Sequence, residues 1–147
     1  FFLTEGVKKS KGVETSAKID PVVSAAVLGA GVMGGGIAQL YADKGIPCRM
    51  KDITPSALQL GIQSAGKIFK RSVQKKKLTN RQYQQKMNLI APVLDFSGFN
   101  SVEFVVEAVI EKMDIKKSVL KDLENYVSDQ CVIASNTSSL SITEMQS

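Results

Sequence analysis

The stretch that decides the fold is Val27-Leu28-Gly29-Ala30-Gly31-Val32-Met33-Gly34. It closes an almost wholly apolar run, residues 22–28, which predicts a strand buried on both faces. It opens into residues 37–44, whose apolar spacing predicts a helix that ends at Gly45. The motif Gly-x-Gly-x-x-Gly is weak alone, but between a strand and a helix it predicts a dinucleotide-binding turn.

Each glycine of this turn has a different expected structural role. Gly29 permits the tight turn, Gly31 lets the backbone approach a pyrophosphate, and Gly34 lets the helix pack close to the strand. The first helical residues, Val32 and Met33, would offer free amide groups and the positive end of the helix dipole to the phosphates. The alternative is a glycine-rich turn that binds no ligand.

An acidic residue follows at the expected distance. Asp52 lies 18 residues after Gly34, at the end of a second predicted strand, residues 46–51. A carboxylate there accepts hydrogen bonds from the adenosine ribose and repels a 2′-phosphate, which favours NAD over NADP. Lys51 slightly weakens that preference. Asp52 could instead be an acidic residue at the start of the next helix, before Pro55.

The remaining pattern alternates strands and helices. A helix is expected from Thr54-Pro55, a second is capped by Thr79, and another is expected near Ser141. Further strands are predicted at residues 89–94, 104–109 and 131–134, with a helix at 114–126. This order predicts a doubly wound α/β fold, a mostly parallel Rossmann-type sheet with a helical hairpin insertion. Residues 21–147 would form this domain, and residues 1–20 the end of a preceding linker.

Composition excludes several kinds of chemistry. The 147 residues contain no histidine, so the chain has no His-based general base, no Ser–His or Cys–His pair and no His-ligated metal. Cys48 and Cys131 lie in apolar stretches without metal-ligand spacing, and we expect buried free thiols in a reducing compartment. Bacterial cytoplasm and mitochondrial matrix both fit. No apolar run reaches the roughly 18 residues that suggest a membrane span.

The net charge of +5 comes from one segment. Residues 67–86 carry eight basic side chains and no acidic one, while the rest of the chain is net negative. This segment could meet phosphates of a nucleic acid or of a nucleotide-bearing substrate. It could equally be a solvated helix face, and Phe69 and Tyr83 are its only aromatic residues.

Two polar groups are expected at the carboxyl ends of later strands. Glu107 and Glu111 flank the end of one strand, with Lys116 five residues beyond Glu111. These residues are either a solvated helix-start pair or carboxylates that bind the nicotinamide ribose or a lysine. Residues 135–139, Ser-Asn-Thr-Ser-Ser, could cap a helix or present a hydroxyl to a substrate carbonyl or alcohol.

Three blocks, in order, resemble the L-3-hydroxyacyl-CoA dehydrogenase family. They are residues 27–38 (VLGAGVMGGGIA), 105–111 (VVEAVIE) and 134–140 (ASNTSSL). Residues 50–53 and the opening Phe1-Phe2-Leu3 look more like the multifunctional fatty-acid oxidation α subunits, which also carry an enoyl-CoA hydratase domain. The resemblance implies oxidation of 3-hydroxyacyl-CoA to 3-oxoacyl-CoA with NAD, and a thiolase β subunit as partner. It implies neither a nucleic-acid partner nor a membrane span.

The resemblance also implies roles for individual residues. Gly29, Gly31 and Gly34 would bind the NAD pyrophosphate, and Asp52 the adenosine ribose. Glu111 and Lys116 match positions near the nicotinamide half of the cofactor. Ser138 matches the serine that hydrogen-bonds the substrate's 3-oxygen, and Lys76 is the candidate for the CoA phosphates, where Lys116 and Ser138 also contribute.

One departure from the family is large. The catalytic histidine belongs to a His-Phe-Phe-Asn-Pro block that this chain lacks, so the chain looks like most of an NAD-binding domain and alone would be inactive. The alternatives are a non-catalytic nucleotide-binding module and another NAD-dependent hydroxyacid dehydrogenase, against which the block at residues 135–139 argues.

Overall fold

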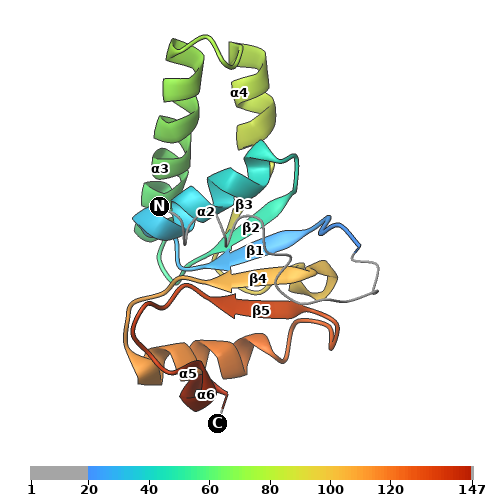
Figure 1. The fold of residues 1–147 in the computed structure, drawn as a ribbon, viewed down its shortest axis with the longest axis vertical. Helices are drawn as coiled ribbons and strands as arrows, with labels where there is room; N and C mark the ends of the chain where they lie inside the picture. The colour runs from blue at the N-terminus through green and yellow to red at the C-terminus, as the bar shows by residue number, and fades with distance from the viewer. Residues whose placement is uncertain (1–19, 147) are drawn as a thin grey trace, which may run out of the picture.

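A computed structural model describes residues 20–146. Its centre is a five-stranded sheet with every strand pair parallel and the order β3-β2-β1-β4-β5 (Figure 1). The strands are β1 (Ala25–Leu28), β2 (Cys48–Lys51), β3 (Ile90–Val93), β4 (Phe104–Glu107) and β5 (Val132–Ser135). The doubly wound fold is therefore confirmed. The predicted linker lies outside the described residues except for Asp20.

Several strands are shorter than predicted. The first was expected from residue 22, but pairing begins at Ala25, which lies opposite Cys48 on one side and Phe104 on the other. Val22 and Val23 precede the first residues of both neighbouring strands, so they have no strand residue opposite them to pair with. Burial on both faces is confirmed, since all four residues of β1 are buried.

The helices follow the predicted signals closely. They are α2 (Val32–Asp43), α3 (Pro55–Gln74), α4 (Asn80–Met87), α5 (Met113–Leu123) and α6 (Ile142–Met145), with a 3₁₀ turn, η1, at Phe99–Ser101. The Thr54 side chain caps α3, and Thr79 forms a reciprocal capping box with Gln82 at the start of α4. Gly45 follows α2 with a φ of 80°, as expected of a residue that ends a helix.

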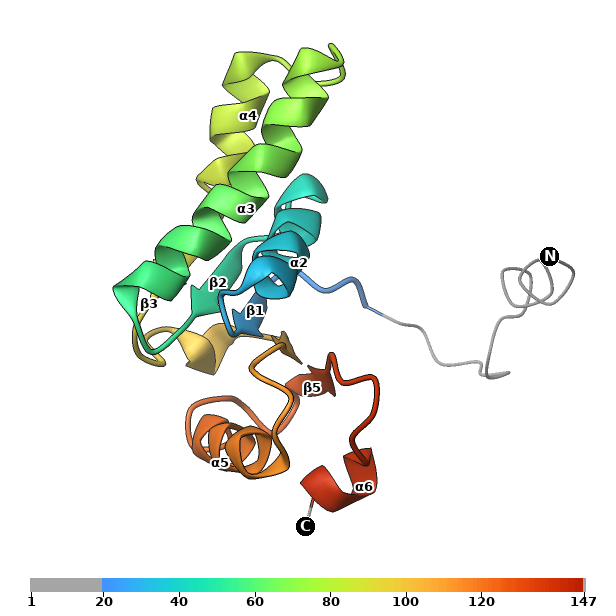
Figure 2. The same ribbon diagram turned by 90° about the vertical axis from the view of Figure 1, so that its left-hand side faces the viewer.

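Helices cover both faces of the sheet. On one face, α2 and α3 bury a cluster that includes Val27, Met50 and Phe69. On the other face, α5 and η1 bury a cluster around Leu28, Phe99 and Leu123. Helices α3 and α4 extend together beyond α2 as a helical hairpin, as Figure 2 shows. The predicted hairpin insertion is present.

The two cysteines differ in environment. Cys48 is buried, and burial raises the pKa of its thiol to about 12. Cys131 is only half-buried, so the expectation of two buried thiols is wrong for this residue. It directly precedes β5, an edge strand whose Val132 is 54% exposed. Among residues 20–146, no helix is both long and apolar enough to cross a membrane.

Candidate functional site

The candidate site lies along the carboxyl edge of the sheet. The strand order reverses between β1 and β4, and at such a switch point the loops that follow the two strands diverge and leave a crevice. The glycine turn follows β1, Asp52 follows β2, and the segments that begin at residues 108 and 136 follow β4 and β5. The topology therefore brings nearly all the predicted residues to one edge.

The glycine turn has the geometry that its sequence predicts. Gly29 has a φ of +95°, and a Cβ there would lie 2.6 Å from the carbonyl oxygen of Ala108. A Cβ on Gly34 would lie 1.8 Å from the carbonyl oxygen of Gly29, so only glycine allows α2 to start this close to the turn. A Cβ on Gly31 would meet nothing within 4 Å, which leaves open space in front of that backbone.

The N-terminus of α2 has free donors. No side chain caps it, no acidic residue lies in its first turn, and the first ladder bond runs from the Gly35 amide to the Gly31 carbonyl. The amides of Val32, Met33 and Gly34 therefore have no partner within the helix. The side chains of Val32 and Met33 are 79% and 59% exposed, so this end of the helix faces solvent. A phosphate group fits these donors.

Asp52 connects β2 to the glycine turn. Its Oδ2 accepts from the Ala30 amide at 2.7 Å, and its Oδ1 accepts from the Ile53 amide at 2.7 Å. The carboxylate is half-buried, and each oxygen keeps a lone pair for a further donor. Asp52 thus helps to shape the turn and still has acceptor capacity toward a ribose hydroxyl.

An apolar pocket of about 250 Å³ adjoins Asp52. One wall comes from the ends of β1 and β2, and the other from the segment after β4 and from α5. Its lining includes Leu28, Ile53, Val109, Ile110, Ile115 and Val119. A flat aromatic ligand such as an adenine ring suits this apolar slot beside a carboxylate.

A buried ion pair lies at the end of β4. Glu107 and Lys116 are both fully buried, and the Lys116 ammonium donates to Glu107 Oε1 at 2.8 Å and to Oε2 at 2.9 Å. Glu107 also accepts from the Val109 amide at 2.7 Å and from the Ser135 hydroxyl at 2.6 Å. The pair is therefore saturated with hydrogen bonds, as a buried charge pair requires.

Glu111 extends this pair to the surface. Its Oε2 lies 3.1 Å from the Lys116 ammonium, and its Oε1 accepts from the hydroxyls of Thr137 and Ser139. The hydrogen bond from Thr137, followed by the hydrogen bond and charge of Lys116, lowers the pKa of the Glu111 carboxyl to about 2. Glu111 thus keeps its negative charge at the mouth of the crevice.

Comparison with known proteins identifies the family. The family model for the NAD-binding domain of 3-hydroxyacyl-CoA dehydrogenase matches residues 24–147. The chain belongs to this family. It is 42% identical over 142 residues to the fatty acid oxidation complex subunit alpha of Psychrobacter cryohalolentis, covering 97% of this chain and 20% of that protein. It is 45% identical over 136 residues to the same subunit of Pseudomonas savastanoi pv. phaseolicola, covering 92% and 19%.

Solved structures of dehydrogenases share the fold. (S)-3-hydroxybutyryl-CoA dehydrogenase from Ralstonia eutropha superimposes with a TM-score of 0.80 at 34% identity, covering 85% of this chain and 44% of that one. 3-Hydroxybutyryl-CoA dehydrogenase from Escherichia coli gives 0.80 at 31% identity, covering 86% and 27%. The predicted family is confirmed, and its NAD-binding description agrees with the predicted cofactor. This 3-hydroxyacyl-CoA dehydrogenase domain spans about a fifth of the length of its curated relatives.

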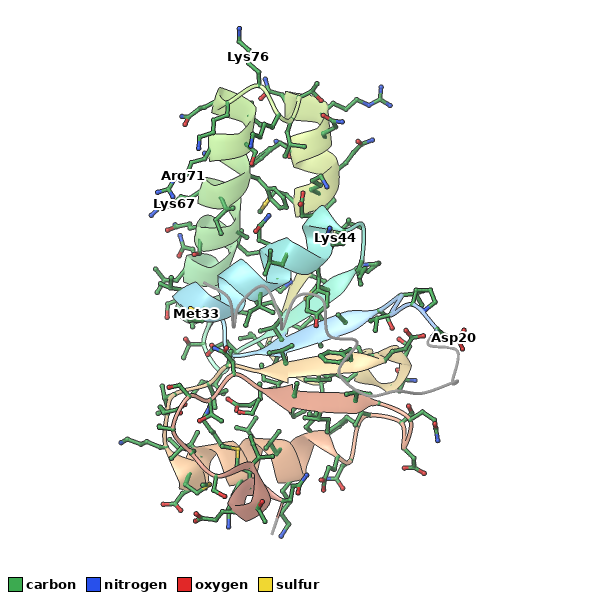
Figure 3. All side chains as sticks on the ribbon, viewed as in Figure 1. Asp20, Met33, Lys44, Lys67, Arg71 and Lys76 are labelled. Carbon is green, nitrogen blue, oxygen red and sulfur yellow. The ribbon has the colours of Figure 1, made fainter. Side chains whose placement is uncertain are left out.

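Within this dehydrogenase domain, Ser138 and Lys76 lie apart from the ion-pair cluster. Ser138 is exposed, and no side-chain hydrogen bond of its hydroxyl is found within residues 20–146. Lys76 is at the tip of the α3–α4 hairpin with a φ of 56°. Figure 3 shows Lys67 and Arg71 extending from α3 on the same side as Met33, while Lys76 points away at the far end.

Three hydroxyls of the polar block at residues 135–139 contact the two glutamates, namely Ser135, Thr137 and Ser139. The sequence predicts either helix capping or substrate contact for this block, and it does not predict these contacts with Glu107 and Glu111. Lys116 was expected near cofactor and substrate, and its side chain is 1% exposed, with the ammonium between two carboxylates. The available signal was a lysine nine residues after Glu107, the glutamate that ends β4, beside a strand that ends in serine.

Proposed function

We propose that this chain binds NAD along the carboxyl edge of its sheet, as part of an enzyme that oxidises 3-hydroxyacyl-CoA to 3-oxoacyl-CoA. The observation that carries the proposal is the junction of Asp52 with the glycine turn, where the carboxylate accepts from the Ala30 amide at 2.7 Å. That contact sets a ribose acceptor next to the free amides of the α2 N-terminus. The family membership supports the same reading.

The chain offers a surface for each part of the cofactor. The amides of Val32, Met33 and Gly34 face the pyrophosphate, and the open space at Gly31 lets it approach. Asp52 accepts from the adenosine ribose, and the apolar pocket beside it takes the adenine. The nicotinamide half then extends across β4 and β5 toward Glu111 and the 136–139 turn, because the other half lies over β2.

The reaction itself needs groups beyond this domain. Bound NAD supplies the hydride acceptor. Ser138 presents an exposed hydroxyl that can donate to the 3-oxygen of the substrate. The chain has no histidine to remove the hydroxyl proton, and it spans about a fifth of its curated relatives. We therefore expect NAD binding but no dehydrogenase turnover by this chain alone.

The basic hairpin is the proposed contact for the CoA phosphates. Lys67 and Arg71 are favoured over Lys76, because they share the side of α3 that faces the carboxyl edge (Figure 3). In the complete enzyme, Lys67→Ala/Arg71→Ala should raise KM for the acyl-CoA, and Lys76→Ala should leave it unchanged. If Lys76→Ala raised KM more than the double substitution did, Lys76 would be the residue that contacts the CoA phosphates.

The proposed assembly follows from the relatives, which are named as subunits of a complex. A thiolase β subunit is the proposed partner, since thiolysis consumes a 3-oxoacyl-CoA. The bacterial cytoplasm is the proposed compartment, where two free thiols stay reduced. Co-purification of thiolase activity with the complete protein, lost after high salt, tests the partner.

Calorimetric titration tests the cofactor assignment. The protein should bind NAD more tightly than NADP, because the Asp52 carboxylate repels a 2′-phosphate. Asp52→Ala should weaken NAD binding roughly tenfold, as expected for the loss of a hydrogen bond to a charged group. The same substitution should reduce the difference in affinity between NAD and NADP. Equal affinity of the unaltered protein for both cofactors would overturn the role of Asp52, and no binding of either would overturn the proposed function.

A further inference from the structure

The turn after β5 is attached to Glu111 through the hydroxyls of Thr137 and Ser139, and the Thr137 hydroxyl also accepts two amide hydrogen bonds within the turn. Thr137 Oγ1 donates to Glu111 and accepts from the Leu140 amide at 3.0 Å and from the Ser139 amide at 3.4 Å. Thr137 therefore closes the turn that carries Ser138 and joins that turn to the segment after β4. A β-branched residue without a hydroxyl would fill the same space and make none of these bonds.

The other end of this connection is the buried pair of Glu107 and Lys116. Glu111 is held by the Lys116 ammonium at 3.1 Å, and Lys116 is fixed by both oxygens of Glu107. The Ser135 hydroxyl ties the last residue of β5 to Glu107, and the Asn136 amide donates to the Glu107 carbonyl oxygen at 2.7 Å. The turn is thus anchored at its start by Glu107 and at its middle by Glu111.

On the basis of the proposed function, we propose that Thr137 is a positioning residue. Its hydroxyl locks the 136–139 turn onto Glu111, and so holds both the Glu111 carboxylate and the Ser138 hydroxyl against the nicotinamide half of the cofactor. Thr137 itself does not touch the reacting atoms. Its side chain is half-buried and directed at Glu111, and Ser138 beside it is exposed.

The 136–139 turn lies on the side of the proposed nicotinamide half, away from the groups that would bind the adenosine half. Asp52 and the apolar pocket belong to the ends of β1 and β2 and to the segment after β4, and none of them contacts Thr137. Loosening the turn should therefore weaken a ligand that reaches β5 and spare one that stops at the pyrophosphate. NADH is the first kind of ligand, and ADP is the second.

The test is calorimetry with NADH and with ADP on the unaltered protein, Thr137→Val and Thr137→Ser. Thr137→Val should lower the NADH affinity roughly tenfold, as for one lost hydrogen bond to a charged group, and should leave the ADP affinity unchanged. Thr137→Ser keeps the hydroxyl and should bind NADH nearly as the unaltered protein does. An unchanged ADP affinity also shows that the variant is folded.

A matched control separates positioning from stability. Thr79→Val makes the same substitution at the cap of α4, on the hairpin, and should lower stability without changing NADH affinity. The proposal is overturned if Thr137→Val binds NADH normally, weakens both ligands equally, or is no worse than Thr137→Ser. Failure of the unaltered protein to bind NADH would instead overturn the proposed function and the inference with it.

Discussion

At the scale of single residues, Glu111 gains its low pKa from side chains of another segment. The Thr137 hydroxyl and the Lys116 ammonium both stabilise the ionised form. Sequence spacing alone left Glu111 and Lys116 open between a solvated pair and a site, because Thr137 lies 26 residues away. The contact exists only because β4 and β5 are neighbours in the sheet.

This contact predicts how stability depends on pH. The pKa of Glu111 falls from its usual 4.5 to about 2 in the folded protein. Its contribution to stability is therefore complete above pH 4.5 and is lost as the pH falls from 4.5 toward 2. In thermal melts, the melting temperature of Glu111→Gln should depend less on pH across this window than that of the unaltered protein. Identical pH dependence of the two proteins would contradict the lowered pKa of Glu111.

Two glycines of α2 give a matched pair of substitutions. A Cβ on Gly34 would collide with the Gly29 carbonyl oxygen at 1.8 Å, whereas a Cβ on Gly36 would meet nothing within 4 Å. Urea unfolding should show Gly34→Ala destabilised by at least about 2 kcal/mol, the range of overpacking. Gly36→Ala should be stabilised by about 0.5–1 kcal/mol, because alanine favours a helix interior. Equal changes in the free energy of unfolding for the two substitutions would show that the start of α2 does not pack against the glycine turn.

At the scale of elements, α5 is joined to the sheet by the buried Glu107–Lys116 pair as well as by its apolar face. Lys116→Met would leave Glu107 buried without its cation, and unfolding experiments should show a loss of roughly 3–5 kcal/mol. Lys121→Met on the exposed side of α5 is the control, with an expected change within about 0.5 kcal/mol. A loss below about 1 kcal/mol for Lys116→Met would mean that the pair is solvated.

Local signals predicted the elements better than they predicted the contacts between them. The caps at Thr54 and Thr79 and the stop at Gly45 depend on neighbouring residues, and the structure has all three. The burial of Lys116 and the partial exposure of Cys131 depend on which strands are neighbours. Cys131 is partly exposed because β5 lies at the edge of the sheet, a position that its apolar sequence does not reveal.

At the scale of the whole molecule, the basic segment and the candidate cofactor site lie on different elements. The eight basic residues of segment 67–86 belong to the α3–α4 hairpin, while the candidate cofactor site lies at the carboxyl edge of the sheet (Figure 1). The glycine motif and Asp52 could be predicted as a pair because one fold places both at the same edge. The connection of Glu107, Glu111 and the 136–139 turn could not, because it needs the positions of three segments at once.

Binding of a dinucleotide at the glycine turn is best tested by amide chemical shifts recorded by NMR during titration with NADH. We expect the largest shifts on Val32, Met33 and Gly34, with Ile53 and residues 136–139 also affected. Largest shifts within residues 67–86, with the amides of the glycine turn unmoved, would contradict it.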